Sequence, residues 1–259
     1  MSNSEFYPLI APKKDGLLAL ESDSWILAPI KTLGNYLEVY SLLLSTAYNH
    51  RIYLDLSAGT GMLEMNNTGE CIYDTSLLAF SSPVQFNRYI FWEPNETYAQ
   101  ALRVRIKRNF KDKNVLIIST SWEKFLEQVR NYVPINTKGI KPWIFCNVNP
   151  RFGFPEIHFF DSIESLDPVV FFTLAGEKKK FWTKLKSGKD DFELYARNHI
   201  RNIEKWTYEN NFRIKGSFSL TESSKMNSLY YQGVLCRKAN VSKVVTEVRR
   251  RSSNQIQLF

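Results

Sequence analysis

The residues with the clearest chemical potential lie at the ends of two short apolar runs. Gly59 and Gly61 follow the run 52–56, and Glu93 ends the run 88–93. Glycine allows a sharp backbone turn and lets a ligand approach the main chain closely. A strand ending in a Gly-x-Gly turn, with an acid at the end of the next strand to accept ribose hydroxyls, is typical of a nucleotide-binding Rossmann-like unit. We therefore expect a nucleotide-like cofactor beside these residues.

The two acids near this turn allow more than one interpretation. Asp55, within the first strand, could hold an amino group of a ligand, or it could accept hydrogen bonds from backbone donors in the turn. Glu93 could bind ribose, or it could be an acid favoured by the dipole of the helix that follows it. The sequence leaves both choices open, although the position of Glu93 favours the ribose.

Hydrophobic periodicity predicts the elements that must position these residues. Apolar residues at helical spacing predict a helix over 25–48, and Asn95 is the expected N-cap of an amphipathic helix over 96–110. Asp74 or Thr75 is expected to cap a further helix. The remaining strands are expected at 115–118, 143–149, 169–174, 212–220 and 229–237, and the remaining helices at 122–132 and 190–210.

Strands that alternate with helices predict an α/β fold, with helices on both faces of a mostly parallel sheet. The last two strands are joined by a short loop and must pair antiparallel. This order resembles the Rossmann-like class I methyltransferase fold, a mostly parallel sheet closed by a C-terminal antiparallel hairpin. We expect one such domain over 21–240, after an N-terminal loop segment, 1–20, and before a basic tail, 241–259.

This resemblance implies that the cofactor is S-adenosylmethionine. The ligand crevice of such a sheet lies at the carboxyl ends of its strands. The glycine turn would face ribose and the methionine part, the polar residues after the third strand would lie by the adenine, and those after the fourth would face the substrate. The residues thereby assigned to the cofactor are Asp55, Gly59, Gly61, Glu93 and Ser119, and those assigned to catalysis are Asn149 and Pro150.

Several motifs resemble the three-Cys-motif partner proteins (TcmP) over roughly residues 20–240. They include the leading helix with Trp25, Lys31, Leu33, Tyr36 and Tyr40, the stretch Tyr53-Leu-Asp-Leu-Ser-Ala-Gly-Thr-Gly61, the stretch Thr75-Ser-Leu-Leu-Ala-Phe80, and the Asn149-Pro150 turn. The resemblance implies a methyltransferase-like fold and, in a bacterium, an association with phage defence or mobile elements. It does not settle an activity.

The chain departs from the family pattern at three positions. Ser57 stands in place of Phe, Thr60 in place of Pro, and Asn149 in place of the substrate-side Asp. Asn is neither a base nor a good metal ligand. Asn149-Pro150-Arg151-Phe152 also resembles the Asn/Asp-Pro-Pro-Tyr/Phe motif of amino methyltransferases, in which the Asn side chain and the Pro carbonyl accept hydrogen bonds from the target amine. Arg151 replaces the second proline of that motif.

Charge and cysteine content bound the possible partners. The net charge of +8 makes polyanions plausible partners, and three widely spaced cysteines form neither a metal knuckle nor a disulfide framework. We expect a cytoplasmic protein with no membrane segment. The basic runs 178–180 and 249–251, together with Arg103, Arg105, Lys107 and Arg108 at the polar positions of the helix over 96–110, favour nucleic acid, although such runs are more often solvated faces.

The last residues, Gln255-Ile-Gln-Leu-Phe259, follow a polar, basic tether and resemble the Gln-x-x-Leu-Phe peptide that docks on the bacterial DNA sliding clamp. Gln255, Leu258 and Phe259 would make that contact; alternatively, the apolar residues fold back onto the domain.

Two functions from different classes remain after these observations. The first is an S-adenosylmethionine-dependent methyltransferase acting on or near nucleic acid. The second is a non-catalytic protein of the same fold that docks on DNA-associated partners. Neither a hydrolase triad nor paired carboxylates with metal spacing appear in the sequence, and no metal is expected.

Overall fold

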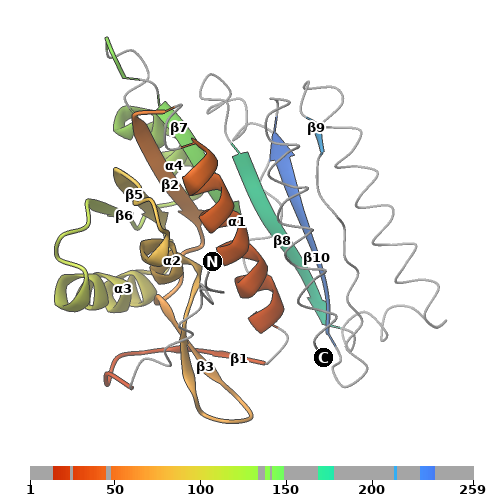
Figure 1. Ribbon diagram of the computed structural model, residues 1–259. Helices are drawn as coiled ribbons and strands as arrows, with labels where there is room; N and C mark the ends of the chain where they lie inside the picture. Colours follow the sequence, from red (N-terminus) through yellow and green to blue (C-terminus); the bar gives the residue numbers. More distant parts are fainter. Residues whose placement is uncertain are drawn as a thin grey trace.

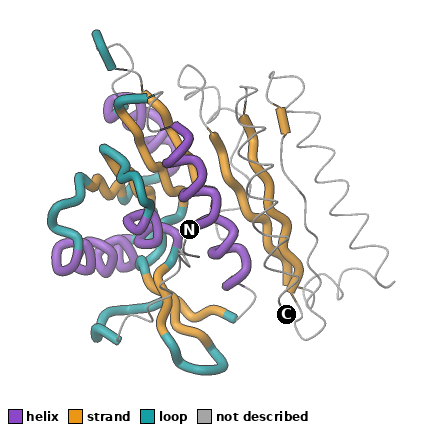
Figure 2. The backbone as a smooth tube through the Cα atoms, viewed as in Figure 1, coloured by secondary structure: helices purple, strands orange, loops and turns teal. Residues whose placement is uncertain are grey.

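The computed structural model of the protein describes residues 14–23, 26–44, 48–133, 138–140, 142–148, 169–177, 213–214 and 228–236. Figure 1 shows a large twisted sheet with helices on it and a second, small sheet at one end, and Figure 2 shows the same view by secondary structure. Asn149, Pro150, the expected helix over 190–210 and the expected clamp-binding peptide lie outside the described residues.

The large sheet has seven strands in the order β6-β5-β2-β7-β8-β10-β9. Its first five strands are parallel, and β10 pairs antiparallel with both β8 and β9. The strands are β2 (His50–Leu56), β5 (Arg88–Trp92), β6 (Val115–Ile118), β7 (Pro142–Val148), β8 (Val169–Glu177), β9 (Arg213–Ile214) and β10 (Ser228–Cys236). This is a Rossmann-like class I methyltransferase fold with its closing antiparallel hairpin, and the prediction of the fold class is confirmed.

Helices cover both faces of the sheet. Successive side chains of a strand point to opposite faces, so each strand contributes to two separate core clusters. Tyr53 of β2 belongs to a core cluster with helices on one face, whereas Ile52, Leu54 and Leu56 belong to a second cluster on the other. The first face carries α1 (Leu27–Leu44), α2 (Thr75–Leu78) and α3 (Glu96–Asn109), and the second carries α4 (Trp122–Val129). Such two-sided burial explains why the parallel strands are apolar almost throughout.

Side-chain caps fix where two helices begin. Asn95 Oδ1 accepts hydrogen bonds from the amides of Thr97, at 3.0 Å, and Tyr98, at 3.3 Å, and so caps α3 as predicted. Asp74 caps α2, where its Oδ1 accepts from the amide of Thr75 at 2.8 Å. The helix predicted over 122–132 ends earlier, because its last turn, Arg130–Tyr132, tightens to a 3-10 helix.

The small sheet was not predicted from the sequence. It contains β1 (Leu20–Ser22), β3 (Met62–Met65) and β4 (Cys71–Tyr73) in the order β1-β3-β4. β3 and β4 form a hairpin around the turn cluster 66–69, and β1 adds parallel to β3, with Leu20 opposite Leu63. The chain after the glycine turn therefore enters a strand, and the helix usual at this point of a Rossmann-like unit, α2, comes only after the hairpin.

Within the part of the chain that the structure describes, no helix combines the length and the apolar character that crossing a membrane requires.

Candidate cofactor site at the carboxyl ends of β2 and β5

The turn after β2 is tightly wound and anchored to the neighbouring strand. The amides of Ser57 and Ala58 both donate to the carbonyl oxygen of Trp92, at 2.9 and 3.0 Å. Ser57, Gly59 and Gly61 have φ angles of 67°, 65° and 82°, in the left-handed region. Glycine adopts this region freely, whereas Ser57 is strained there. The turn thus places three unusual backbone conformations within five residues.

Gly61 is required by packing inside the protein. A Cβ at this position would lie 2.8 Å from Leu102 Cδ1 on α3 and 2.8 Å from Leu77 Cγ on α2. Both contacts are shorter than real Cβ contacts, and the positive φ independently strains any residue with a side chain. Gly61 therefore lets α2 and α3 close over the turn, whatever it also does for a ligand.

Glu93 connects the end of β5 to the glycine turn. Its side chain is buried, Oε2 accepts from the Gly59 amide at 2.7 Å, and Oε1 accepts from the Asn95 amide at 2.9 Å. Hydrogen bonds to a charged acceptor are stronger than neutral ones. A buried carboxylate thus lies at the adjoining carboxyl ends of β2 and β5, where the sequence predicted an acid for ribose.

Asp55 lies in a buried network of side chains. Oδ2 accepts from Tyr53 Oη at 3.1 Å and from Thr75 Oγ1 at 2.8 Å, and Oδ1 accepts from Asn147 Nδ2 at 3.1 Å. Burial raises the pKa of Asp55 to about 7; the hydrogen bonds oppose this rise, and the nearby charge of Asp74 adds to it. The donors come from β2, α2 and β7, whereas the sequence had suggested either a ligand or backbone donors of the turn.

Asn147 was not singled out from the sequence, although a signal existed. It stands directly opposite Asp55 in the register of β7 against β2 and is buried. A polar residue within an otherwise apolar central strand needs a buried partner. The polar pair Asp55 and Asn147 therefore marks the middle of the sheet next to the turn.

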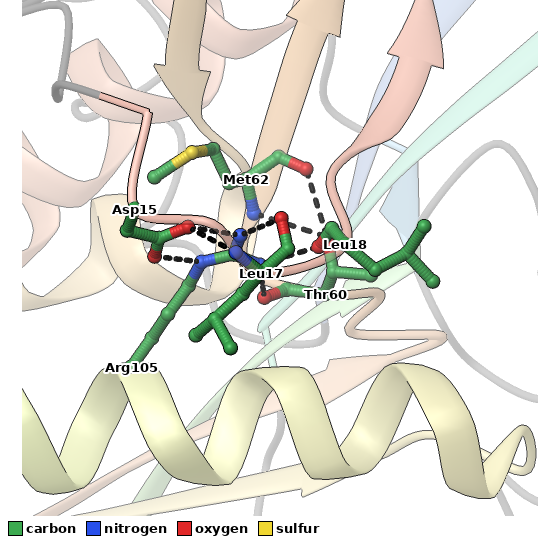
Figure 3. A network of polar contacts seen from close by, with 6 residues as sticks. All are labelled: Asp15, Leu17, Leu18, Thr60, Met62 and Arg105. Atoms are coloured by element: carbon green, nitrogen blue, oxygen red, sulfur yellow. Dashed lines mark hydrogen bonds and ion pairs between the residues drawn. The ribbon is translucent and has the colours of Figure 1, made fainter.

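The carbonyl side of the turn is held by a buried arginine, Arg105 of α3 (Figure 3). Its guanidinium has five donors, and all five are used. Nε and Nη2 donate to the carboxylate of Asp15 at 2.8 and 2.9 Å. Nη1 donates to the carbonyl oxygens of Leu18 and Thr60 at 2.8 and 2.7 Å, and Nη2 also donates to that of Leu17 at 3.1 Å.

The prediction that all the arginines of α3 lie on its polar side was wrong for Arg105. Arg105 is 1 % exposed, because it lies three residues after Leu102 and next to Ile106, on the stripe that faces the core. It ties the segment 15–18, expected to be a free loop, to the glycine turn. Burial alone would raise the pKa of Asp15, but hydrogen bonds from Arg105 and from the Leu17 amide outweigh burial and lower it.

The end of β6 supplies the remaining polar groups. Ser119 is half-buried and, after Arg103, its side chain contributes to lowering the pKa of Glu96, at the start of α3. The next residue, Thr120, accepts from Trp92 Nε1 at 3.0 Å through its carbonyl oxygen. Its hydroxyl Oγ1 is buried and has no hydrogen-bond partner among the described residues. A buried orphan hydroxyl is unfavourable, which makes Thr120 Oγ1 a candidate ligand contact.

The predicted cofactor residues thus fall into two groups. Asp55, Gly59, Gly61 and Glu93 lie together at the ends of the paired strands β2 and β5, whereas Ser119 follows β6, one strand further out. The predicted catalytic residues come directly after β7, outside the described residues.

Comparisons with known proteins support the fold. No family model matches the chain, and no curated protein does. Protein LPL1258 from Legionella pneumophila has a similar structure, with a TM-score of 0.51 and 12 % identity over 84 % of this chain and 90 % of that one.

Two weaker likenesses are the O-methyltransferase from Bacillus cereus in complex with SAH and the methyltransferase domain of bacterial CtHen1. Their TM-scores are 0.43 and 0.42, and their identities 17 % and 14 %, over 79 % of this chain in both cases and 80 % and 99 % of theirs. The strand order of the sheet and the likeness to LPL1258 show the fold.

Proposed function

We propose that this protein binds S-adenosylmethionine at the carboxyl ends of β2, β5 and β6 and transfers its methyl group to a nucleic acid. The observation that carries the proposal is the buried carboxylate of Glu93, 2.7 Å from the Gly59 amide, at the adjoining ends of two parallel strands. In a Rossmann-like sheet an acid at this position accepts the ribose hydroxyls of the cofactor.

The donor set fits the cofactor at two further points. The orphan hydroxyl of Thr120 and the neighbouring Ser119 lie where the adenine would be, and the wound turn with Gly59 and Gly61 lies where ribose and the methionine part would be. Asp55, which precedes the turn in β2, would orient the turn. S-adenosylmethionine supplies an activated methyl group when it is bound; the chain itself binds, orients and excludes water.

The substrate side of the proposal rests on the sequence. Asn149 and Pro150 follow the last residue of β7, and the Asn side-chain oxygen would accept a hydrogen bond from a target amine. The net charge of +8 supports a polyanionic substrate, and the resemblance to the TcmP family supports a bacterial defence or mobile-element setting. The buried free thiols of Cys71 and Cys146 are in keeping with a cytoplasmic protein.

The test is transfer of a tritiated methyl group to double-stranded DNA, single-stranded DNA and RNA. We expect incorporation into one of the three by the wild type and strong loss in Asn149→Ala, with cofactor affinity nearly unchanged, because Asn149 would contact the substrate only. Asn109→Ala, the same change at an exposed residue of α3, is the matched control. Equal incorporation by Asn149→Ala and the control would contradict the assignment.

A second candidate function, a non-catalytic protein of this fold, is favoured by one observation. Main-chain groups of the turn already bond within the protein: the Gly59 amide to Glu93, the Thr60 carbonyl to Arg105, and the Gly61 carbonyl to the Asp74 amide. A turn held in this way keeps its shape without a ligand. Lack of any cofactor binding would favour this candidate.

Either function is compatible with a place at replicating DNA. We propose that Gln255, Leu258 and Phe259 dock on the bacterial sliding clamp, because apolar and aromatic anchors carry most of the energy in such short contacts. The assay uses purified clamp with the full chain and with a chain lacking Leu258 and Phe259. Undiminished binding by the shortened chain would rule out this contact.

A further inference from the structure

A groove of about 410 Å³ lies along α3 beside the edge strand β6. Four cations and no acid line it among the described residues: Arg103, Lys107, Lys111 and Lys113. Arg103 is ion-paired with Glu96, and Lys113 with Asp112, whereas Lys107 and Lys111 are exposed. The groove therefore has a positive rim that a negatively charged partner would complement.

The floor of the groove is aliphatic. Ile106 comes from α3, and Val115 and Ile117 come from the same face of β6, since they alternate along the strand. Phe110 also lines the groove and is half-buried, but its ring already packs on Phe80 and Tyr73, with the centroids 4.7 and 6.1 Å apart. The floor offers apolar contact without a free aromatic ring on which a base could stack.

The strand beside the groove is an edge. β6 is the outermost strand of the large sheet and pairs with β5 alone among the described strands (Figure 1). Its sequence, Val115-Leu-Ile-Ile118, carries no charge, and Val115, Leu116 and Ile117 are only half-buried. Proteins usually protect such an edge, because its backbone N–H and C=O groups can pair with another chain.

We propose that this groove is the docking surface for an extended acidic segment of a partner protein. The segment adds to the edge of β6 as a further strand, which gives it main-chain hydrogen bonds. Alternate side chains then face the groove, where apolar ones meet Val115 and Ile117 and carboxylates meet Lys107 and Lys111. The site lies between α3 and β6 and does not depend on cofactor binding.

Two other occupants fit the surface less well. A second copy of this chain would bring one positive rim against another, and like charges directly opposite one another are unfavourable. A nucleic acid would satisfy the cations, but it would leave the strand edge unpaired and would meet an aliphatic floor without a stacking ring.

The experiment is fluorescence anisotropy with the full chain and a labelled, capped ten-residue peptide, Glu-Ser-Val-Ser-Glu-Ser-Val-Ser-Glu-Ser, whose glutamates and valines lie on one face of an extended strand. We expect saturable binding, and a loss of about tenfold or more in the double variant Lys107→Glu, Lys111→Glu, because two attractive charges become repulsive. The matched control is Lys124→Glu, Lys138→Glu, which makes the same charge change at two exposed lysines away from the groove and is expected to keep the wild-type affinity.

Backbone pairing is tested separately from charge. Two further versions of the peptide keep all carboxylates but have every second amide N-methylated, one version at the odd and the other at the even positions. In one of the two, the methylated amides are those that would donate to β6. That version is expected to bind about tenfold more weakly. Absence of binding by the unmodified peptide, or equal binding by all three peptides, would overturn the proposal. So would tighter binding of a single-stranded 20-nucleotide DNA that the groove variant abolishes, since it would make the groove a nucleic-acid surface.

Discussion

The glycine turn is held from two sides by two buried charges of opposite sign. On the amide side, Glu93 accepts from the backbone of Gly59 and Asn95; on the carbonyl side, Arg105 donates to Thr60 and to the segment 15–18. Arg105 has no donor left, because all five of its N–H groups are bonded. Glu93 bonds main-chain amides through both of its carboxylate oxygens, at the strand ends where we propose that the cofactor binds.

Arg105 is therefore a structural anchor, whereas Glu93 is the anchor at which we propose that the cofactor binds. Arg105 joins the turn to Asp15, which lies 90 residues before Arg105 in the chain, and it has the saturated bonding of a structural group. The glutamate anchor lies at the strand ends where a Rossmann-like sheet binds its cofactor. Removing the first should therefore change stability most, and removing the second should change binding most.

The largest expected effect is that of Arg105→Met. Methionine fills much of the volume but leaves Asp15 and three carbonyl oxygens without their donor, and breaking a buried pair costs about 3–5 kcal/mol. Urea unfolding measures the loss. Arg103→Met is the matched control on the same helix, where an exposed ion pair with Glu96 contributes at most about 1 kcal/mol.

If Arg105→Met does not fold, Asp15→Asn tests the same anchor more gently. Equal losses in the Arg105 and Arg103 variants, or no loss in Asp15→Asn, would show that the carbonyl side of the turn is not held by this network.

The next largest expected loss of stability comes from changing a glycine of the turn itself. Gly61→Ala should destabilise the protein by about 2–4 kcal/mol, since the left-handed conformation and the contacts with Leu77 and Leu102 both oppose a methyl group. Gly69→Ala is the control. Gly69 has a φ of +66° and no atom closer than 3.9 Å to an added Cβ, so only the conformational cost of about 1–2 kcal/mol applies. Unfolding free energies that fall equally in the two variants would contradict the packing role of Gly61.

A smaller effect concerns Asp55, the acid behind the turn. Its folded-state pKa, about 7, is above the unfolded value of about 4, so the folded protein binds the extra proton between these values, and stability falls as pH rises through that window. From pH 5 to pH 8 the loss is about 2–3 kcal/mol, at about 1.4 kcal/mol per pH unit. Asp55→Asn should remove this part of the slope in urea unfolding, and a slope identical to that of the wild type would contradict it.

Much of the fold could be predicted because its signals are local. The apolar runs, the Asn95 cap and the glycine turn each lie within a few residues, and the order of elements then limits the sheet to few topologies. Glu93 was found in the same way, because its position at a strand end is visible in the sequence.

The parts that were missed depend on distant partners. Asp15 and Arg105 look like ordinary surface residues until the fold brings them together, although the spacing of Arg105 from Leu102 on the buried stripe of α3 was a usable signal. The pairing of Leu20 with Leu63 joins strands of three and four residues, too short for a periodicity to appear. The buried Asn147 required the register of β7 against β2.

The proposed cofactor site is tested most directly by calorimetric titration with S-adenosylmethionine and with its demethylated product. The titration compares the wild type with Glu93→Gln and with the control Arg103→Met. We expect the wild type and the control to bind alike and Glu93→Gln to bind roughly 10- to 100-fold more weakly, because charge-assisted hydrogen bonds contribute about 1.5–3 kcal/mol each. Circular dichroism and urea unfolding should show a folded Glu93→Gln protein. No heat of binding by the wild type at millimolar cofactor, or unchanged affinity in Glu93→Gln, would contradict the cofactor site.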